Sequence, residues 1–182
     1  CASGPFMGHI QRPSDAKTPK RIAFLQCVGS RDVTVGNPYC SSVCCMYAIK
    51  EAVVALEHEP ALDLSIFYMD MRTQGKGFEE FYERGKQQGI TFVRSKVSSL
   101  KEIPGTKNLI VHYAEENGTL KEQEFDLVVL SVGLEPAKKA QELASTMKIS
   151  LNDYRFAQTE LFSPIKTSRE GIFVAGAFQG PK

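Results

Sequence analysis

The chain has 182 residues, of which 42% are hydrophobic and 24% charged, so a packed core is expected and disorder is not. Its net charge of +1 gives no electrostatic reason to expect nucleic acid or a membrane surface as a partner. The longest apolar run, Leu127–Leu130, is far too short to span a bilayer, and no signal peptide or lipidation motif is visible. We therefore expect no direct membrane insertion.

The first half of the chain alternates between strand and helix patterns. Arg21–Val28 is apolar with polar ends, which is typical of a buried parallel strand. Apolar residues at steps of three or four predict a helix over Ser41–His58, and Pro60 ends it. Leu64–Met69 is a second strand pattern. Residues 1–20 lack periodicity and are rich in Gly, Pro, Ser and Lys, so they are predicted to form a linker or loop.

A second helix is predicted over Gly75–Gln88 and a third strand over Ile90–Val93. Strands that alternate with helices in this way form a parallel, doubly wound sheet with right-handed crossovers. The predicted fold class is therefore α/β and Rossmann-like.

The second half has a different pattern. Leu109–Tyr113 and Leu120–Val129 are predicted strands, and Asn117-Gly118 between them is a strong hairpin signal. A helix is then predicted over Lys138–Met147 and a strand over Gly171–Ala175. By analogy of fold, a Rossmann half followed by a small antiparallel meander and a returning strand is the plan of the thioredoxin-reductase-type nucleotide domain in flavoproteins.

Three domain parts are predicted. By the same analogy of fold, residues 1–19 would be a linker or a piece of an FAD domain, residues 20–136 the Rossmann-like domain carrying the cysteines, and residues 137–182 a C-terminal piece of an FAD-binding domain. The first residue is Cys1, and the chain ends after a strand pattern without a closing helix. We interpret the sequence as a fragment of a longer protein.

Four of the five cysteines are clustered: Cys27, Cys40, Cys44 and Cys45. Cys27 ends the first predicted strand, and Cys40 and Cys44 are four residues apart, which predicts that they share one helical face. All four thiols can therefore lie near the strand–helix turn, and four thiolates are what a [4Fe–4S] cluster needs. The helix N-terminus favours an anionic cluster. Cys1, in the linker, is not expected to take part.

The turn after the first strand has lost the usual nucleotide signature. It reads Val28-Gly29-Ser30-Arg31-Asp32 and lacks the G-x-G-x-x-G pattern that lets the backbone contact a pyrophosphate. We infer that the domain has exchanged a nucleotide for a metal cluster. Two alternatives stay open on the pattern alone: a structural zinc site, although an adjacent Cys-Cys pair is unusual there, and plain buried or redox-active thiols.

Several runs resemble a known family over nearly the whole chain. The runs are SGPFMGHIQRPSD, RIAFLQCVGSRD, PYCSSVCCMYAIKEA, FYMDMRTQGKGFEEFY, LVVLSVGLEP and GIFVAGAFQGPK. They resemble heterodisulfide reductase proteins of the A type (HdrA-like) and their relatives, including flavoprotein subunits of quinone-interacting oxidoreductases. The resemblance implies FAD in a thioredoxin-reductase-like fold together with iron–sulfur clusters. By position, it implies that Cys27, Cys40, Cys44 and Cys45 are [4Fe–4S] ligands.

For FAD, the resemblance implies contacts at the return from the nucleotide domain and at a late strand. The residues concerned are Gly133, Pro136, Thr167, Gly171 and Gly176. An Asp that holds the ribityl chain in related flavoproteins is replaced here by Ala177, and no G-x-G-x-x-G for FAD is present. We therefore expect the isolated chain to bind FAD poorly. The competing explanation for Gly133 and Gly176 is that a tight turn at a strand end requires glycine there.

The resemblance implies a cytoplasmic FAD- and iron–sulfur-dependent oxidoreductase. It would pass electrons between a donor module and ferredoxin or a disulfide- or quinone-linked acceptor. The implied partners are other redox subunits, namely heterodisulfide reductase B- and C-like subunits, hydrogenase or formate dehydrogenase modules, and ferredoxin. No residue is expected to act as acid, base or nucleophile. Two rival hypotheses remain: a pyridine-nucleotide-disulfide-reductase-like enzyme with a Cys44/Cys45 redox pair, and a noncatalytic interaction module stapled by zinc.

Overall fold

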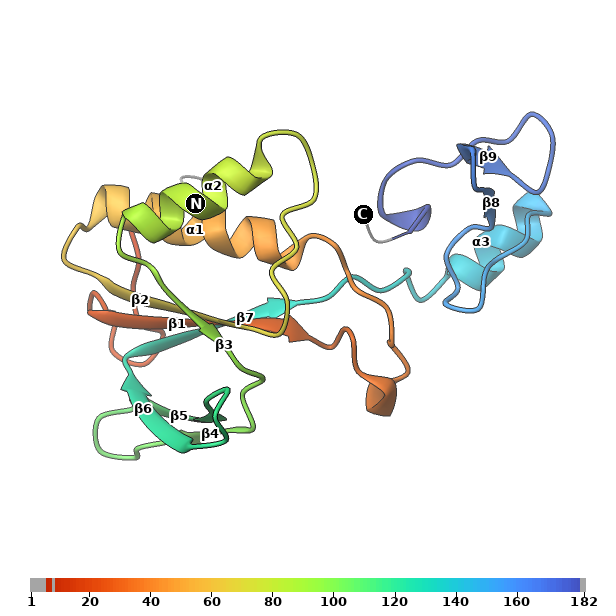
Figure 1. Ribbon diagram of the computed structural model, residues 1–182. Coiled ribbons are helices and arrows are strands. Elements are labelled where there is room, and N and C mark those ends of the chain that lie inside the picture. Colours follow the sequence, from red (N-terminus) through yellow and green to blue (C-terminus); the bar gives the residue numbers. More distant parts are fainter. Residues whose placement is uncertain (1–5, 8, 181–182) are drawn as a thin grey trace. The chain divides into compact units, whose positions relative to one another are not determined.

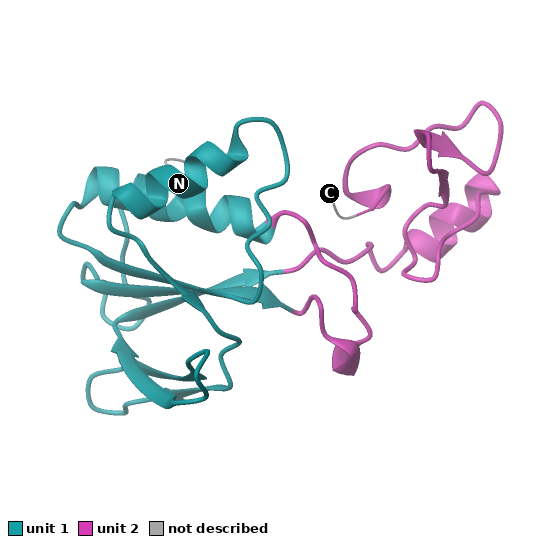
Figure 2. Ribbon diagram, viewed as in Figure 1, with its two compact units in different colours: residues 1–28, 44–132 teal, residues 29–43, 133–182 magenta. Residues whose placement is uncertain are grey.

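A computed structural model describes residues 6–7 and 9–180 of the protein. The chain divides into two compact units (Figure 2). The first unit comprises residues 1–28 and 44–132, and the second comprises residues 29–43 and 133–182. Cys1 lies outside the described residues. The three domain parts expected from the sequence stay a prediction.

The first unit is built on a four-stranded parallel sheet with the order β3-β2-β1-β7 (Figure 1). Its strands are β1 (Arg21–Val28), β2 (Asp63–Tyr68), β3 (Thr91–Arg94) and β7 (Leu127–Val132). All three neighbouring pairs are parallel. Apolar runs and alternating helices predicted such a sheet, and the Rossmann-like fold class is confirmed.

Two helices, α1 (Cys44–His58) and α2 (Phe78–Gln87), lie on one face of this sheet (Figure 1). The small and branched residues of α1, including Ala48, Ile49 and Ala52, are fully buried against the sheet. Small side chains allow a helix to approach a sheet closely, so this face holds the larger apolar core.

The opposite face is covered by a three-stranded antiparallel sheet (Figure 1). Its strands are β4 (Ser99–Glu102), β5 (Leu109–Ala114) and β6 (Leu120–Phe125). Gly118 has a φ of 84° in the β5–β6 turn, so the predicted hairpin is confirmed. The core on this side is centred on Phe67 and Phe125, whose rings meet edge to face at 5.9 Å.

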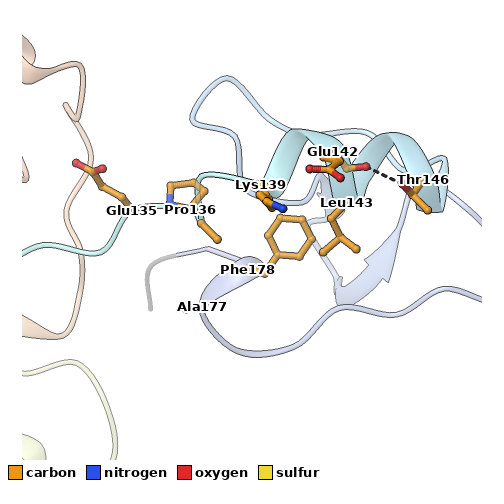
Figure 3. Close-up of a pocket in the computed structure, with 10 residues that line it drawn as sticks. Glu135, Pro136, Lys139, Glu142, Leu143, Thr146, Ala177 and Phe178 are labelled. Carbon is orange, nitrogen blue, oxygen red and sulfur yellow. Dashed lines mark hydrogen bonds between the residues drawn. The ribbon is translucent and has the colours of Figure 1, made fainter.

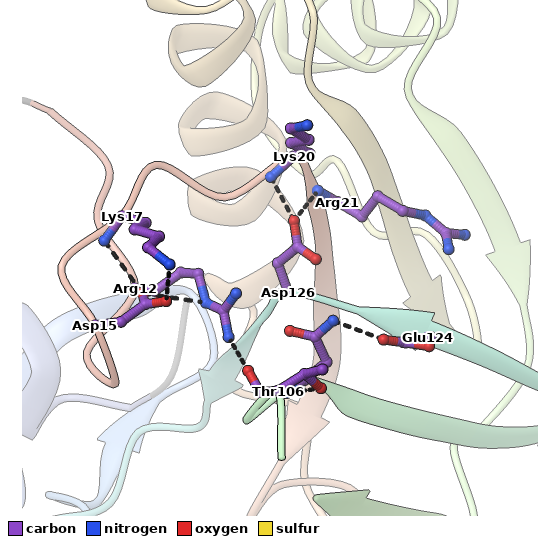
Figure 4. Close-up of polar contacts among 9 residues, drawn as sticks. Arg12, Asp15, Lys17, Lys20, Arg21, Thr106, Glu124 and Asp126 are labelled. Carbon is purple, nitrogen blue, oxygen red and sulfur yellow. Dashed lines mark hydrogen bonds and ion pairs between the residues drawn. The ribbon is translucent and has the colours of Figure 1, made fainter. Parts of the chain in front are cut away.

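The predicted continuous strand Leu120–Val129 is wrong in one respect, because Asp126 divides it into β6 and β7. One carboxylate oxygen of Asp126 accepts hydrogen bonds from the backbone N–H groups of Lys20, at 2.6 Å, and Arg21, at 3.1 Å (Figure 4). The carboxylate thereby takes up the two donors where β1 begins. This contact anchors the start of the central strand to the point at which the chain passes from one sheet to the other.

The second unit has little regular structure. It contains α3 (Ala140–Met147), the short strands β8 (Thr159–Glu160) and β9 (Ser163–Thr167), and two 3₁₀ turns, Val33–Val35 and Gly176–Phe178. The strand predicted over Gly171–Ala175 is wrong. Within it, only Phe173 forms an isolated bridge, with Lys166, because Gly171 adopts a left-handed turn with a φ of 78°.

In the described part of the chain, no helix is both long and apolar enough to cross a membrane.

Candidate metal centre

The end of β1 is distorted where it carries the first clustered cysteine. The pairing of β1 with β7 shifts between Leu25 and Val28, so Gln26 and Cys27 lie opposite the single residue Ser131. Cys27 has a φ of 61°, a left-handed conformation that costs a non-glycine residue about 1–2 kcal/mol. Bulges of this kind often redirect a side chain next to a functional site. The sheet thus carries strain at the residue whose thiol the sequence singles out.

The last two clustered cysteines begin the helix α1. Cys44 and Cys45 are the first residues of α1 and are 1% and 4% exposed. The helix begins three residues later than predicted, since Ser42 adopts a left-handed φ of 58°. Both thiols therefore lie at the positive end of the helix dipole, where unpaired N–H groups favour negative charge.

Within the first unit, the thiol of Cys44 contacts those of Cys27 and Cys45. Hydrogen bonds from these two thiols hold the pKa of Cys44 far below its ordinary value, against the opposing effect of burial. The pKa of Cys45 is raised, because its thiol donates to Cys44 and is buried. Its Sγ also lies 3.9 Å from the carbonyl oxygen of Asp70. Three of the four predicted cluster ligands are thus brought together.

Cys40 belongs to the second unit. It is half-buried, and its Sγ accepts a hydrogen bond from the backbone N–H of Ser42 at 3.3 Å. The prediction that Cys40 and Cys44 share one helical face is wrong, since Cys40 precedes the helix. Only three residues separate it from Cys44 along the chain.

The donor set suits iron and sulfide. Thiolates are the usual ligands of iron–sulfur clusters, and the sequence places four of them close together along the chain. Among the described residues, no three His, Cys, Asp or Glu side chains are arranged to hold a single metal ion. A cluster is larger than an ion, and its ligands surround it rather than contact one another. The four thiols therefore have the right chemistry for an iron–sulfur cluster. The three that contact one another would have to move apart to bind it.

Two residues near these thiols whose polar side-chain atoms are buried were missed by the sequence reasoning. Neither side-chain polar atom of Gln26 has a hydrogen-bond partner, and the hydroxyl of Ser131 has none either. The available signal was a glutamine in the last part of an apolar strand pattern, directly before Cys27. The pairing register that puts Ser131 opposite both residues could not be read from the sequence.

The first residue predicted to contact FAD, Gly133, lies in a tightly packed site of the second unit. A Cβ atom at this position would lie 2.8 Å from the Cβ of Ser30 and 3.1 Å from the Oγ of Ser41. Those two serines are buried, and their hydroxyls are hydrogen-bonded at 3.0 Å. Only a glycine allows the chain to pass this close to them.

A pocket of about 690 Å³ lies beside α3 in the second unit (Figure 3). Pro136, which precedes α3, lines this pocket, and so does Ala177, the residue after Gly176. Leu143 and Phe178 supply apolar walls, and Lys139 and Glu142 add charge. Of the five residues predicted to contact FAD, one therefore lines this pocket and another adjoins it.

The remaining two, Thr167 and Gly171, lie at and after the end of β9. The buried hydroxyl of Thr167 donates to the carbonyl oxygen of Ile172 at 2.8 Å, closing a turn in which Gly171 is left-handed. Neither residue lines the pocket beside α3. Their contacts are those of a structural turn.

Solved structures share the fold of this chain. Thioredoxin reductase of Lactococcus lactis matches 98% of the chain and 48% of its own length, with a TM-score of 0.58 and 19% identity. LpdA of Mycobacterium tuberculosis matches 91% of the chain and 31% of its own length, with a TM-score of 0.52 and 14% identity. These likenesses show the fold alone and agree with the thioredoxin-reductase-type plan expected from the sequence.

No family model matches the chain. Curated relatives match it from end to end. The second A-type iron-sulfur subunit of the CoB–CoM heterodisulfide reductase of Methanopyrus kandleri is 52% identical over 100% of the chain. The A-type subunit of the H(2)/formate:CoB-CoM heterodisulfide,ferredoxin reductase of Methanococcus maripaludis is 48% identical over 99% of it. The chain spans 28% of the length of each of these relatives. With this identity along its whole length, the chain belongs to the A-type family of heterodisulfide reductase subunits, as the counterpart of a part of those proteins.

Proposed function

We propose that this chain is the part of a heterodisulfide reductase A-type oxidoreductase that holds a [4Fe–4S] cluster and passes electrons through it. The observation that carries the proposal is the contact of Cys44 with Cys27 and Cys45, where β1 ends and α1 begins. The name of the Methanopyrus kandleri relative, an iron-sulfur subunit, supports it.

Cys27, Cys40, Cys44 and Cys45 would be the four ligands. Three of the thiols come from one strand end and one helix start, and Cys40 is linked to them by a three-residue connection. Ligand binding requires the thiols to separate and to lose their protons. The helix N-terminus favours the resulting negative charge, and the low pKa of Cys44 supplies a first thiolate.

The bound cluster would supply one-electron transfer, and the chain would set the potential at which it occurs. Nothing in this function requires an acid, a base or a nucleophile. The residues of the chain act by holding the cluster, by excluding water from the buried end of α1 and by presenting hydrogen-bond donors to the sulfurs.

FAD would be bound by the longer protein, with Gly133, Pro136, Thr167, Gly171 and Gly176 forming part of its site. The pocket beside α3, which Pro136 lines, supports this assignment. Ala177 also lines that pocket and provides no carboxylate to hold a ribityl chain. We expect the isolated chain to bind FAD weakly, because only part of a site is present on it.

The partners would be other redox subunits of a cytoplasmic assembly. The relatives' names mention H(2) in several cases, formate in one and ferredoxin in several. Modules of the hydrogenase or formate dehydrogenase type, heterodisulfide reductase B- and C-like subunits and ferredoxin are therefore the proposed donors and acceptors.

Anaerobic preparation of the chain tests the cluster. We expect about four irons and about four acid-labile sulfides per chain, with a brown colour that bleaches on adding dithionite. Cys40→Ala should lose the colour, whereas Cys1→Ser, a change at the remaining cysteine, should keep it. Equal iron in both variants would remove Cys40 from the ligand set.

The same preparation separates the rival functions. Stoichiometric zinc in colourless protein would support a zinc-stapled module. Neither metal, with a titratable thiol pair, would support redox chemistry at Cys44 and Cys45. A disulfide between adjacent residues is disfavoured on geometry, since neighbouring Cα atoms lie about 3.8 Å apart and bridged cysteines are usually farther apart.

A further inference from the structure

Gln26 and Ser131 form a pair of polar side chains without partners at the bulge in β1. In the part of the chain that the structure describes, Nε2 and Oε1 of Gln26 and Oγ of Ser131 are buried and make no hydrogen bond. Ser131 is 0% exposed. The hydroxyl of Tyr47 donates to the carbonyl oxygen of Val132 at 2.7 Å. Its oxygen also faces the Ser131 hydroxyl, which acts to lower the pKa of Tyr47. Folded proteins rarely leave such groups unpaired, and those that persist call for a ligand, an ion or a bound water.

The position of Gln26 relates it to the cysteines. Side chains alternate along a strand, and Ile22 and Phe24 belong to the core beneath α1. Gln26 is the next residue on that face. The contact between Cys27 and Cys44 brings the end of β1 next to the first residue of α1, so this face of β1 ends near Cys44. Cys27 is the next residue along the chain and contacts Cys44.

Ser131 completes the arrangement from the neighbouring strand. It is the single residue of β7 opposite Gln26 and Cys27 in the bulge. A hydroxyl and a carboxamide therefore flank the strained cysteine, one on its own strand and one on the adjacent strand. Both can donate a hydrogen bond, and the amide donor of Gln26 has no acceptor within the described chain.

We propose that Gln26 and Ser131 donate hydrogen bonds to the iron–sulfur cluster held by Cys27, Cys44 and Cys45, and thereby raise its reduction potential. The proposal rests on the proposed function. An electron added to the cluster increases the negative charge on its sulfurs, and charge-assisted hydrogen bonds strengthen as that charge grows. The two donors therefore stabilise the reduced cluster more than the oxidised one.

The competing explanation is an ordered water that bridges the two groups. A buried water needs several polar partners, and an amide next to a hydroxyl could provide them. Removal of either group would then alter stability while leaving the potential of the cluster unchanged. The two explanations thus differ in the potential and can be separated by measuring it.

The test is a redox titration of the anaerobically loaded chain, monitored by electron paramagnetic resonance. Gln26→Leu, which keeps the size of the side chain and removes its donor, should lower the reduced-to-oxidised ratio at a fixed potential about tenfold. For a one-electron couple a tenfold change corresponds to about 59 mV. Ser131→Ala should shift the ratio in the same direction.

Gln123→Leu is the matched control. It makes the same chemical change on β6, in the antiparallel sheet, where the side chain accepts a hydrogen bond from Tyr113. We expect the potential of this variant to equal that of the unmodified chain. Iron and sulfide content should be the same in all of the variants, because none of the three residues is a proposed ligand.

The outcomes are distinct. A cluster present in every variant at an unchanged potential overturns the inference and leaves the proposed function standing, whereas no cluster in the unmodified chain overturns both. If Gln26→Leu does not take up a cluster, the test is made on the unmodified chain, with the side-chain amides of its glutamines labelled with ¹⁵N. Hyperfine coupling of that nitrogen to the reduced cluster supports the hydrogen bond, and its absence overturns it.

Discussion

The thiol of Cys27, in a left-handed conformation at the end of β1, contacts the thiol of Cys44 at the start of α1. Two residues that are separated in sequence by residues 28–43 thus share a hydrogen bond between sulfurs. The hydrogen bonds among these thiols shift the pKa values of two adjacent helix residues in opposite directions. The pKa of Cys44 is lowered and that of Cys45 is raised. A thiolate can therefore form readily at Cys44, beside the two thiols that donate to it.

Removing Cys27 should raise the pKa of Cys44. In Cys27→Ala the largest stabilising contact of the thiolate is lost, so we expect its ultraviolet absorbance to appear at higher pH than in the unmodified, metal-depleted chain. A folded-state pKa below the unfolded value stabilises the fold above the unfolded-state pKa, about 8.5. This contribution is lost as pH falls through the folded-state pKa, and in Cys27→Ala it should be lost at higher pH.

Cys1→Ser controls for the loss of any one thiol, and its titration should overlay that of the unmodified chain. A thiolate band that appears at the same pH in Cys27→Ala as in this control would contradict the hydrogen bond between Cys27 and Cys44.

The parallel sheet could be predicted because its strands are buried on both faces and are therefore nearly continuous apolar runs. β4 could not be predicted by that rule, since all four residues of Ser99–Glu102 are exposed and show no apolar alternation. The start of α1 was placed too early because a backbone φ at Ser42 decides it, and serine carries no strong signal for a left-handed conformation.

For the candidate site, cysteine spacing identified the residues, and the fold determined which of them meet. The contact of Cys44 with Cys27 depends on the strand–helix crossover, which the apolar pattern indicated. The roles inferred for Gln26 and Ser131 depend on a register shift between strands that are about a hundred residues apart in sequence. No local pattern contains that information.

Gly133→Ala should destabilise the second unit. The added Cβ would lie 2.8 Å from the Cβ of Ser30, closer than the two carbons can approach, so buried backbone must move. We expect a loss of about 1–3 kcal/mol in the free energy of unfolding, as for other overpacked sites, measured by denaturant titration. Gly105→Ala, where nothing lies within 4 Å, is the control and should be nearly neutral.

A second substitution tests the cause of that loss. Because the contact is with the Cβ of Ser30, Ser30→Gly should recover part of the stability of Gly133→Ala, whereas Ser30→Ala should not. Equal recovery by both would show that the lost hydroxyl contact, and not the carbon contact, sets the cost.

Lys148→Gly should stabilise the second unit. Lys148 ends α3 with a φ of 56°, and its backbone N–H bonds to the carbonyl oxygens of Ala144 and Ser145. Glycine adopts this left-handed cap without steric cost, so a gain of about 0.5–1 kcal/mol is expected. Thermal unfolding should show a higher midpoint for Lys148→Gly than for Lys148→Ala. A midpoint no higher than that of the alanine variant would contradict the role of the cap geometry.

Loading of the cluster should slow amide hydrogen exchange at Ser42. Its N–H already points at the Sγ of Cys40 at 3.3 Å. If Cys40 becomes a ligand, its sulfur carries negative charge, and a hydrogen bond to a charged acceptor is shorter and stronger than one to a neutral thiol. Exchange measured by mass spectrometry before and after anaerobic loading should therefore show new protection at this amide.

The control is the amide of Gly118, in the β5–β6 turn, which donates to the carbonyl oxygen of Glu115 at 2.9 Å and has no sulfur partner. Its exchange should be the same in both states. In Cys40→Ala the protection at Ser42 should not appear, because its acceptor is gone. Protection of Ser42 that persists in Cys40→Ala would show that general tightening of the loop, and not a charged sulfur at Cys40, slows the exchange.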